Sequence, residues 1–451
     1  MANPRVALVS LGCVKNLVES EVLLGRLAAG GFDLCADPAM ADVAVINTCG
    51  FLADSEKESM EAIDAATALK GKGRLRAVVV AGCLPQRYGP EFEKRLRGVD
   101  AVLGISARDD LLRTCSTLLE KRRAGEPLTI VPPPDSRCAT DRDRVRLTPR
   151  HTAYVRVSEG CDHTCSFCVI PQIRGKFRSK PMEEIVAEVR ELAADGAREI
   201  NLIAQDTSTY GADLYGEPSL DGLLKRLEDV PGVEWIRILY CYPTTVTDRL
   251  ILEIARNSKV VKYLDLPVQH TREKILRAMR RGTPEARQKD LIRKLRDGVP
   301  GLVLRTTVLV GFPGETEEDF EGLLEDLREL RFERLGAFAY SREAGSRSDA
   351  LEGHLPEEVR LKRRERVMVQ QQAIAFTLNK GMVGREVPVL VDRRLGKGRW
   401  EGRTAGDAPE IDPVITLSGN SVREGDLARA RVTGWSGYDL IGTVRARGGK
   451  P

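Results

Sequence analysis

Apolar runs alternate with amphipathic segments along the first third of the chain. The runs predict strands, and the segments between them, whose apolar residues recur at helical spacing, predict helices. We expect strands at 5–10, 42–47, 76–81 and 101–103 and helices at 17–29, 55–69 and 91–97. Strands that alternate with helices indicate a parallel sheet covered by helices. The pattern therefore predicts an amino-terminal open parallel α/β domain over residues 1–128.

A stretch rich in proline and charge interrupts this pattern. Pro132, Pro133 and Pro134 can continue neither a helix nor a central strand, so we place a linker at 129–146. Beyond it we expect strands at 153–157, 199–203, 235–239, 263–266, 302–309 and 336–340 and helices at 182–194, 220–227, 247–255, 271–280, 286–296 and 317–327. Six such βα units predict a central partial (βα)6 barrel over residues 147–378, with its chemistry at the carboxyl ends of the strands.

The pattern changes again near the carboxyl end of the chain. A charged helix, expected at 355–376, leads to short alternating runs separated by glycines, at 386–392, 414–417, 427–433 and 440–445. Short strands of this kind are typical of a small β-barrel of oligonucleotide-binding-like (OB-like) shape. We place this barrel at 380–451.

Composition agrees with a globular protein of about three domains. The chain has 451 residues, of which 42 % are hydrophobic and 30 % charged, and its net charge is only +4. This charge is too small to indicate a nucleic-acid partner, although it does not exclude one. No apolar run approaches the length of a membrane span, and no secretory segment follows Met1. Ten cysteines without an export signal favour a cytoplasmic protein whose cysteines bind metal or act in catalysis.

The most informative motif is a trio of cysteines directly after the strand at 153–157. Cys161, Cys165 and Cys168 are spaced Cys-x3-Cys-x2-Cys. A [4Fe–4S] cluster held by three thiolates keeps one iron open for a small molecule, as a radical enzyme needs to bind S-adenosylmethionine. A structural zinc site is the alternative, with only His163 nearby as a fourth ligand. Disulfides are a second alternative, but three close cysteines cannot all pair.

A second trio comes from the amino-terminal domain. Cys13, Cys49 and Cys83 each follow one of its first three strands, and each has a glycine beside it. Carboxyl ends of parallel strands share one edge of a sheet, and glycines let the backbone approach closely there. Three converging thiolates would hold a second cluster; the alternative is three buried core cysteines. The remaining cysteines show no such pattern and are expected to be structural or incidental: Cys35, Cys115, Cys138 and Cys241.

These motifs resemble a known family. The second cysteine loop, with Phe167 before its last cysteine, resembles the radical S-adenosylmethionine signature. The first trio is similar to the amino-terminal domain of methylthiotransferases, and the last region is similar to their TRAM module. Four stretches are similar to the branch that modifies an aspartate of small-subunit ribosomal protein twelve: 10–20, 47–51, 204–211 and 407–412. Val14 departs mildly from that branch, which often has proline there.

The resemblance implies two [4Fe–4S] clusters, with Cys161, Cys165 and Cys168 as catalytic and metal ligands and the other trio as metal ligands. It also implies S-adenosylmethionine as radical source and methyl donor, and a β-methylthioaspartyl product. The radical would remove hydrogen from an unactivated carbon, which acid–base catalysis could not do. Four residues are candidates for binding the cosubstrate: Phe167, Gln205, Asp206 and Gln269. Phe167 is equally explained by core packing, whereas the others, like His270, follow barrel strands and should face the active mouth.

The resemblance also implies partners. These are ribosomal protein twelve, free or in the ribosomal subunit, an electron donor such as flavodoxin or ferredoxin, and a sulfur carrier, with no membrane. Two alternatives stay open: a transfer-RNA adenosine methylthiotransferase, and a non-catalytic iron–sulfur protein that binds RNA or carries electrons.

Charge in the last region argues weakly against nucleic acid as a direct substrate. Residues 380–451 hold 13 Lys and Arg against 9 Asp and Glu, and the acidic stretch 407–412 should form a lip that repels phosphate and suits a basic protein. Trp400, Trp435 and Tyr438 would stack bases or, more commonly, pack in a core. Two local expectations remain. Arg174, Lys176 and Arg178 could face an acidic substrate, but a run of charge is usually solvated. The stretch 310–316 should form mainly a tight turn with Thr316 capping the next helix, and in part shape the ribose or methionine pocket.

Overall fold

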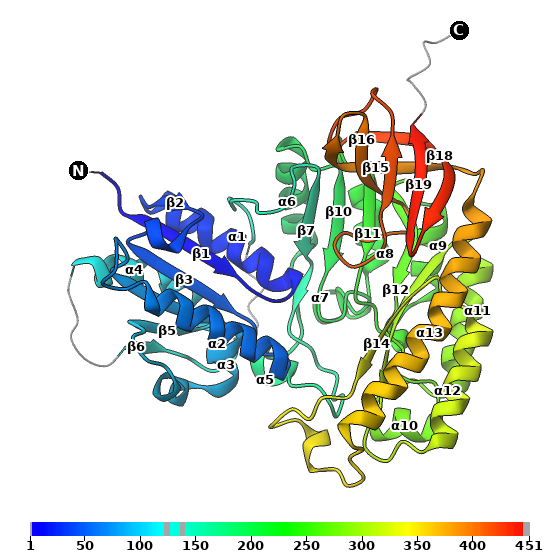
Figure 1. Ribbon diagram of the computed structural model, residues 1–451, viewed down its shortest axis with the longest axis horizontal. Helices are drawn as coiled ribbons and strands as arrows, with labels where there is room; N and C mark the ends of the chain where they lie inside the picture. Colours follow the sequence, from blue (N-terminus) through cyan, green and yellow to red (C-terminus); the bar gives the residue numbers. More distant parts are fainter. Residues whose placement is uncertain (1, 121–126, 136–139, 445–451) are drawn as a thin grey trace.

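A computed structural model describes residues 2–120, 127–135 and 140–444 and arranges them in three units (Figure 1). Cys138 and the last residue of the strand expected at 440–445 lie outside the described residues. The units are built on a six-stranded parallel sheet, a second six-stranded parallel sheet and a closed five-stranded barrel. The fold class expected from the hydrophobic pattern is confirmed.

The amino-terminal sheet has the strand order β2-β1-β3-β4-β5-β6. Its strands are β1 (Arg5–Ser10), β2 (Asp33–Cys35), β3 (Val43–Thr48), β4 (Ala77–Gly82), β5 (Ala101–Gly104) and β6 (Leu128–Ile130). Its α-helices are α1 (Val14–Ala29), α2 (Ala53–Ala68), α3 (Cys83–Tyr88) and α4 (Leu111–Glu120), with 3₁₀ turns at Pro38–Met40, Pro90–Arg95 and Ile105–Asp110. The helix expected at 91–97 is a 3₁₀ helix over Pro90–Arg95. β3 and β4 are buried along their whole length because α1 and α4 cover one face of the sheet and α2 covers the other.

The second sheet has the order β14-β13-β12-β11-β10-β7, and β7 and β14 are its two edges among the described strands. Its strands are β7 (Thr152–Arg156), β10 (Glu199–Ile203), β11 (Trp235–Ile238), β12 (Val260–Asp265), β13 (Val303–Val310) and β14 (Arg334–Ala339). The helices are α5 (Ile170–Arg174), α6 (Met182–Ala194), α7 (Ala212–Tyr215), α8 (Leu220–Glu228), α9 (Asp248–Arg256), α10 (Glu273–Ala278), α11 (Glu285–Gly298), α12 (Glu317–Leu330) and α13 (Glu357–Met382). A small ribbon of β8 (Ser158–Glu159) and β9 (Arg178–Ser179) flanks the cysteine loop. The partial barrel is thus an open sheet with parallel strands throughout.

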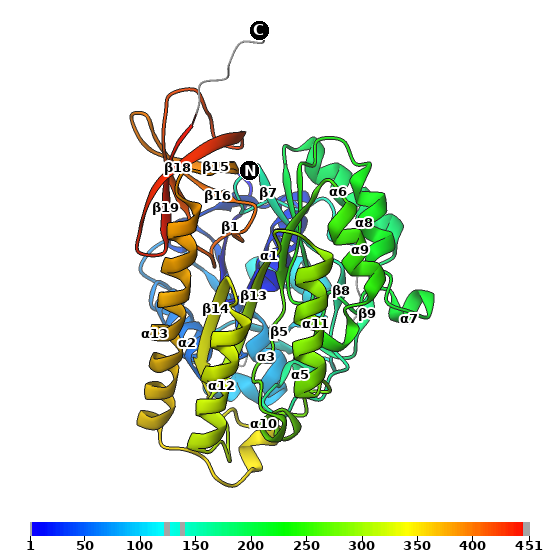
Figure 2. The same ribbon diagram turned by 90° about the vertical axis from the view of Figure 1, so that its right-hand side faces the viewer.

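The long helix α13 carries the chain to the carboxyl-terminal barrel (Figure 2). The barrel has the order β15-β16-β17-β19-β18, from β15 (Glu386–Gly396), β16 (Arg399–Thr404), β17 (Ile415–Ser418), β18 (Leu427–Ser436) and β19 (Asp439–Val444). Phe376 of α13 packs against the rings of Trp435 and Tyr438 at centroid distances of 5.0 and 5.5 Å. Trp400 donates its ring N–H to a backbone oxygen at 3.0 Å. These aromatic residues therefore contribute to packing.

The acidic stretch 407–412 does not form the expected lip. Arg334 of β14 donates to Asp407 at 2.6 Å, and the Tyr263 hydroxyl of β12 donates to Asp412 at 2.6 Å. Both carboxylates point into the second sheet, and only Glu410 is exposed among the acidic residues of the stretch. The stretch attaches the barrel to the sheet because Arg334, Arg305 and the Tyr263 hydroxyl of that sheet face its carboxylates.

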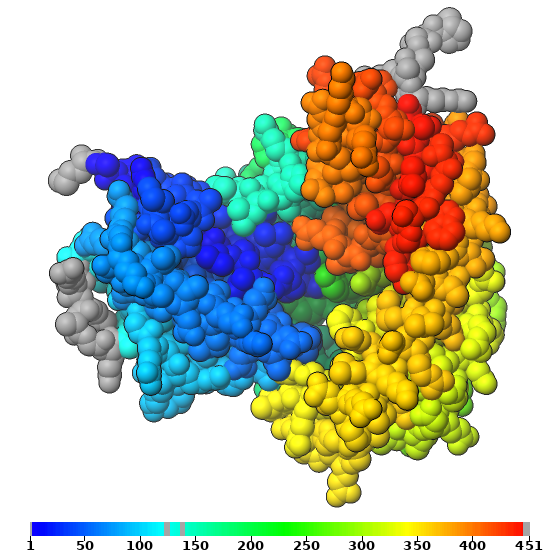
Figure 3. Space-filling view, in the orientation of Figure 1, coloured from blue at the N-terminus to red at the C-terminus, as the bar shows by residue number. Residues whose placement is uncertain are grey.

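No helix in the described part of the chain is long and apolar enough to cross a membrane. The space-filling view shows the surface hollowed where the amino-terminal unit, in blue, meets the other two units (Figure 3).

Candidate active site

One cavity of about 550 Å³ lies between the amino-terminal unit and the carboxyl ends of the second sheet. Its volume is typical of a small-molecule site. Both cysteine trios line it: Cys13, Cys49 and Cys83 from one unit, and Cys161, Cys165 and Cys168 from the other. The structure therefore brings together two sets of thiols that are far apart in the sequence.

The loops of the first trio pack tightly against one another. Cys13 follows β1 and is the N-cap of α1, and Cys83 starts α3 directly after β4. Gly12 has a φ of +85°, and a Cβ on it would lie 2.7 Å from the Cys49 sulfur. The Asn16 amide donates to Leu11 O at 2.7 Å and to Asn47 O, near the end of β3, at 3.1 Å. Glycine and asparagine at these positions let the cysteine loops meet.

Arg174, expected to be solvated, is buried between the two units. Its guanidinium donates to the Cys83 sulfur at 3.4 Å and to Glu159 at 3.0 Å. Glu159 also accepts from the Gln205 amide at 2.9 Å and from Arg156 at 2.6 Å. Burial would raise the pKa of Glu159, but Arg174 and Arg156 lower it to about 2. The expectation for Arg174 was wrong because its partner is distant in sequence; Lys176 and Arg178 are exposed as expected.

The surroundings of the thiols are consistent with their being ligands of a metal cluster. Burial raises the pKa of Cys83, Cys161 and Cys168 each to about 12, so these thiols need a metal to become thiolates near neutral pH. Burial would also raise the pKa of Cys13, but Lys15 and Arg174 lower it. No three His, Cys, Asp or Glu side chains among residues 2–120, 127–135 and 140–444 could hold a single metal ion. The fit to a cluster therefore rests on the donor set, its burial and the shared cavity.

Aromatic and cationic side chains surround the second trio. The His163 ring stacks on Tyr242 at 3.6 Å between centroids, and its Nε2 lies 2.7 Å from Asp206. Arg281 lies 4.0 Å from the Tyr242 ring and donates to the Cys165 sulfur at 3.7 Å. Asp206 is buried behind His163 and, unlike His163, does not line the cavity. Its place is behind the wall, where it orients the imidazole.

The other candidate residues differ in whether they line the cavity. Gln205, Gln269 and Phe167 line the cavity, and Phe167 also packs against the core around Phe312. The Gln205 Oε1 is buried and accepts no hydrogen bond from the described residues. His270, expected at the mouth, is fully buried, and its Nδ1 accepts from a backbone N–H at 3.0 Å.

Three family models match the chain: the radical SAM superfamily over residues 155–327, the uncharacterized protein family UPF0004 over 5–104, and the TRAM domain over 383–444. A protein of Anaeromyxobacter sp. named ribosomal protein uS12 methylthiotransferase RimO is 44 % identical over 98 % of this chain and 94 % of its own. Proteins of the same name from Pelotomaculum thermopropionicum (44 %, covering 97 % and 98 %) and Geobacter sulfurreducens (42 %, covering 98 % and 99 %) are similar. The chain belongs to the RimO family.

Solved structures agree with the fold of this RimO-family chain. The radical S-adenosylmethionine methyltransferase TsrM of Kitasatospora setae, with tryptophan and a SAM analogue bound, has a TM-score of 0.56 at 15 % identity and covers 75 % of this chain and 74 % of its own. OxsB, a cobalamin-dependent radical enzyme, has a TM-score of 0.50 at 13 % identity, covering 80 % and 56 %. The radical SAM domain implies a [4Fe–4S] cluster and S-adenosylmethionine.

Several wall residues of the RimO-family cavity were not identified from the sequence. Tyr240, Cys241 and Tyr242 follow β11. The expectation that site residues follow the carboxyl ends of strands, which identified Gln205, could therefore also have identified them. Cys241 thus lies in the site wall, although it was expected to be incidental. Lys15 and Arg281 carry no comparable signal, because neither directly follows a strand.

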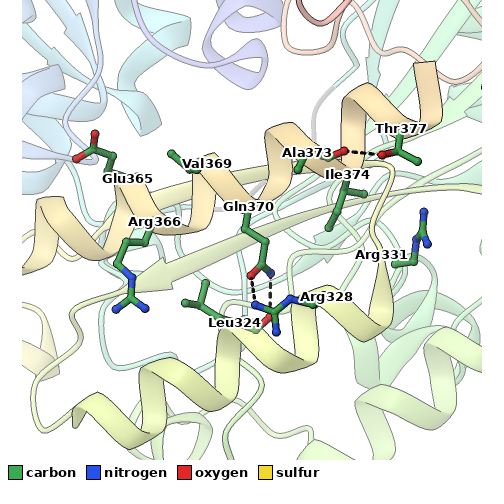
Figure 4. Close-up of a pocket in the computed structure, with 10 residues that line it drawn as sticks. All are labelled: Leu324, Arg328, Arg331, Glu365, Arg366, Val369, Gln370, Ala373, Ile374 and Thr377. Carbon is green, nitrogen blue, oxygen red and sulfur yellow. Dashed lines mark hydrogen bonds between the residues drawn. The ribbon is translucent and has the colours of Figure 1, made fainter. Parts of the chain in front are cut away.

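A larger cavity of about 870 Å³ lies between α12 and α13 of the RimO-family chain (Figure 4). It is more open than the cysteine cavity and contains no cysteine among its lining residues. Arg328 donates to Gln370 across it at 3.0 Å. Volume alone therefore does not identify the active site; the thiols do.

Proposed function

We propose that this chain methylthiolates the β-carbon of an aspartate in small-subunit ribosomal protein uS12, with two [4Fe–4S] clusters and S-adenosylmethionine. The observation that carries the proposal is that both cysteine trios line one cavity. Cys161, Cys165 and Cys168 would hold one cluster, and Cys13, Cys49 and Cys83 the other. When bound, these groups supply the radical that removes a hydrogen, the sulfur that replaces it, and the methyl group.

Residues of the cavity wall would bind and orient the cosubstrate and stabilise the cysteine ligands. Gln205 offers its unpartnered Oε1 to the amino group of S-adenosylmethionine while its amide N–H remains on Glu159. Phe167 offers a ring face to adenine from the same wall, since aromatic faces stack readily on bases. Arg174 donates to the sulfur of Cys83 and keeps negative charge on that side of the cavity stable.

The partners follow from this chemistry. The substrate is uS12, free or within the ribosomal subunit, and the reaction also needs an electron donor of the flavodoxin or ferredoxin kind and a sulfur carrier. Full-length relatives named for uS12 support this substrate over transfer RNA. Trp435 packs against Phe376 of α13, whereas Tyr438 meets the same ring at a steep angle and is exposed, so the aromatic residues of the barrel do not decide between the two substrates.

The test compares the two substrates directly. Protein reconstituted without oxygen and then reduced is incubated with S-adenosylmethionine and either a peptide of the uS12 aspartate loop or a transfer-RNA anticodon stem-loop. We expect the peptide alone to gain one methylthio group by mass spectrometry, and Cys165→Ala to release no 5′-deoxyadenosine. A mass gain on the RNA alone would contradict the proposal.

The two-cluster part of the proposal has its own measurement. Iron and sulfide analysis with spectroscopy should give two clusters in the unmodified protein and one in Cys49→Ala. Cys35→Ala, which changes a cysteine outside the cavity, is the matched control and should keep both. Methylthiolation by a Cys49→Ala protein that holds one cluster would remove the second cluster from the mechanism.

A further inference from the structure

Three strongly cationic side chains line the active-site cavity, whereas no aspartate or glutamate of the described chain does. Two of the three already have partners. Arg174 donates to Glu159 and to the Cys83 sulfur. Arg281 donates to Pro267 O at 2.5 Å and lies against Tyr242 and Cys165. The third cation, Lys15, is different.

Lys15 is only 7 % exposed, and its side chain reaches the cavity from the first turn of α1. Its ammonium lies 2.8 Å from the centre of the Tyr240 ring. Within the described residues, no carboxylate comes within 4.0 Å of this ammonium, and it donates no hydrogen bond to them. Cys13, two positions earlier, and Asp265 act on this ammonium through their charge but are not hydrogen-bonded to it. A ring face compensates a buried cation only in part, and a buried charge without a hydrogen-bonded anion is unfavourable. This ammonium therefore suits an anion that enters with a ligand.

Tyr240, whose ring the Lys15 ammonium contacts, has a fixed backbone conformation. Tyr240 has a φ of +62°, a conformation that non-glycine residues rarely adopt and that clusters at functional sites. Its N–H donates to Asp265 at 3.0 Å. Asp265 also accepts from Arg305 at 2.9 Å. The carboxylate of Asp265 thus holds the backbone of Tyr240 and pairs with Arg305, so its hydrogen bonds do not go to Lys15.

We infer that Lys15 binds the side-chain carboxylate of the substrate aspartate and so holds the β-carbon beside the two cysteine trios. This inference rests on the proposed function. The β-carbon is bonded directly to the carboxylate carbon, so fixing that group fixes the reacting atom. Asparagine has the same shape but would leave the cation of Lys15 uncompensated. Sites built around a specific polar contact reject analogues that lack it, so the enzyme should prefer aspartate.

The experiment measures peptide binding rather than turnover. Reconstituted, oxygen-free protein is titrated with labelled uS12 loop peptides that carry aspartate or asparagine at the target position. The unmodified protein should bind the aspartate peptide about 10-fold or more tightly than the asparagine peptide, as expected for a hydrogen bond to a charged group. In Lys15→Met this ratio should fall to about one, while Lys15→Arg should keep most of it. Lys57→Met, at an exposed lysine of the same unit, should leave the ratio unchanged.

The alternatives give different results. If Lys15 has a purely structural role, Lys15→Met should bind both peptides equally more weakly and keep the ratio of their affinities. That result would overturn the inference. S-adenosylmethionine also carries a carboxylate, so its affinity is measured without peptide. Weaker cosubstrate binding with an unchanged peptide ratio in Lys15→Met would assign Lys15 to the cosubstrate and also overturn the inference. If the unmodified protein neither binds nor modifies the aspartate peptide, the proposed function itself fails.

Discussion

Single residues decide whether the two halves of the cavity fit together. Arg174 is the clearest case, because one guanidinium joins a cysteine of the amino-terminal unit to Glu159 of the β8–β9 ribbon. Arg174 stands in a run of basic residues, which usually indicates a solvated surface. Its burial depends on Glu159, fifteen positions earlier, and on a cysteine of another unit. Sequence pattern shows neither partner.

Gly12 gives a prediction at the same scale. In Gly12→Ala the new Cβ would lie 2.5 Å from the Cβ of Cys49, so one cysteine loop must move and the cluster of that trio should be lost. Gly31→Ala is the matched control, because Gly31 has nearly the same φ, +87°, but open space around it. Both variants should lose about 1 kcal/mol from backbone strain. Iron analysis should show one cluster in Gly12→Ala and two in Gly31→Ala; two in both would contradict the proposed trio.

At the scale of single elements, α12 shows how a local signal sets a helix boundary. Thr316 accepts from the Asp319 N–H at 3.2 Å, and Asp319 accepts from the Thr316 N–H at 3.0 Å, which completes the cap expected from the sequence. Thr316→Ala should lower the free energy of unfolding by about 1 kcal/mol, measured by chemical denaturation. Thr377→Ala, in the exposed part of α13, changes a threonine without a cap and should have little effect. Equal losses in both variants would show that the cap is unimportant.

Elements with a strong local pattern could be predicted from the sequence, and elements defined by distant partners could not. The strand 199–203 and the helix 182–194 were predicted with the bounds of β10 and α6, because each has a clear apolar pattern. β16 was missed, since Arg399–Thr404 has no apolar alternation and its Arg403 instead pairs with Glu199 of another unit at 2.8 Å. β2 and β6 are three-residue edge strands that carry too few residues for a period. In the site, the expectation that functional residues follow the carboxyl ends of strands correctly predicted that six cysteines and Gln205 lie at one cavity. It could not distinguish residues that line the cavity from residues buried behind its wall.

At the scale of the whole molecule, Glu199 connects the carboxyl-terminal barrel to the second sheet. It is fully buried between Arg403 and Arg237, which lies 3.1 Å away. Burial would raise the pKa of Glu199, but these two arginines lower it to about 2. A carboxyl whose pKa is lower in the folded state stabilises the fold above its ordinary pKa and loses that contribution as pH falls.

We therefore predict that thermal stability falls as pH drops from about 4.5 towards 2, with Glu199 contributing on the order of 3 kcal/mol. Glu199→Gln should be less stable near neutral pH, because it leaves two buried arginines without their carboxylate, and its melting temperature should depend less on pH in the acid range. Glu410→Gln, at an exposed glutamate of the barrel, is the control. If the melting temperature of Glu199→Gln depends on pH as steeply as that of the unmodified protein, Glu199 is not the cause of the loss of stability in acid.

The division of the cavity wall between residues 12–83 and 161–281 has a consequence for damaged molecules. A chain severed before residue 147 keeps the whole second sheet and the loop of Cys161, yet has lost the side of the chamber that faces it. In such a fragment the loop of Cys161 would be more exposed to solvent than in the intact chain. Because the fragment lacks Cys13, Cys49 and Cys83, it could not complete the proposed methylthiolation.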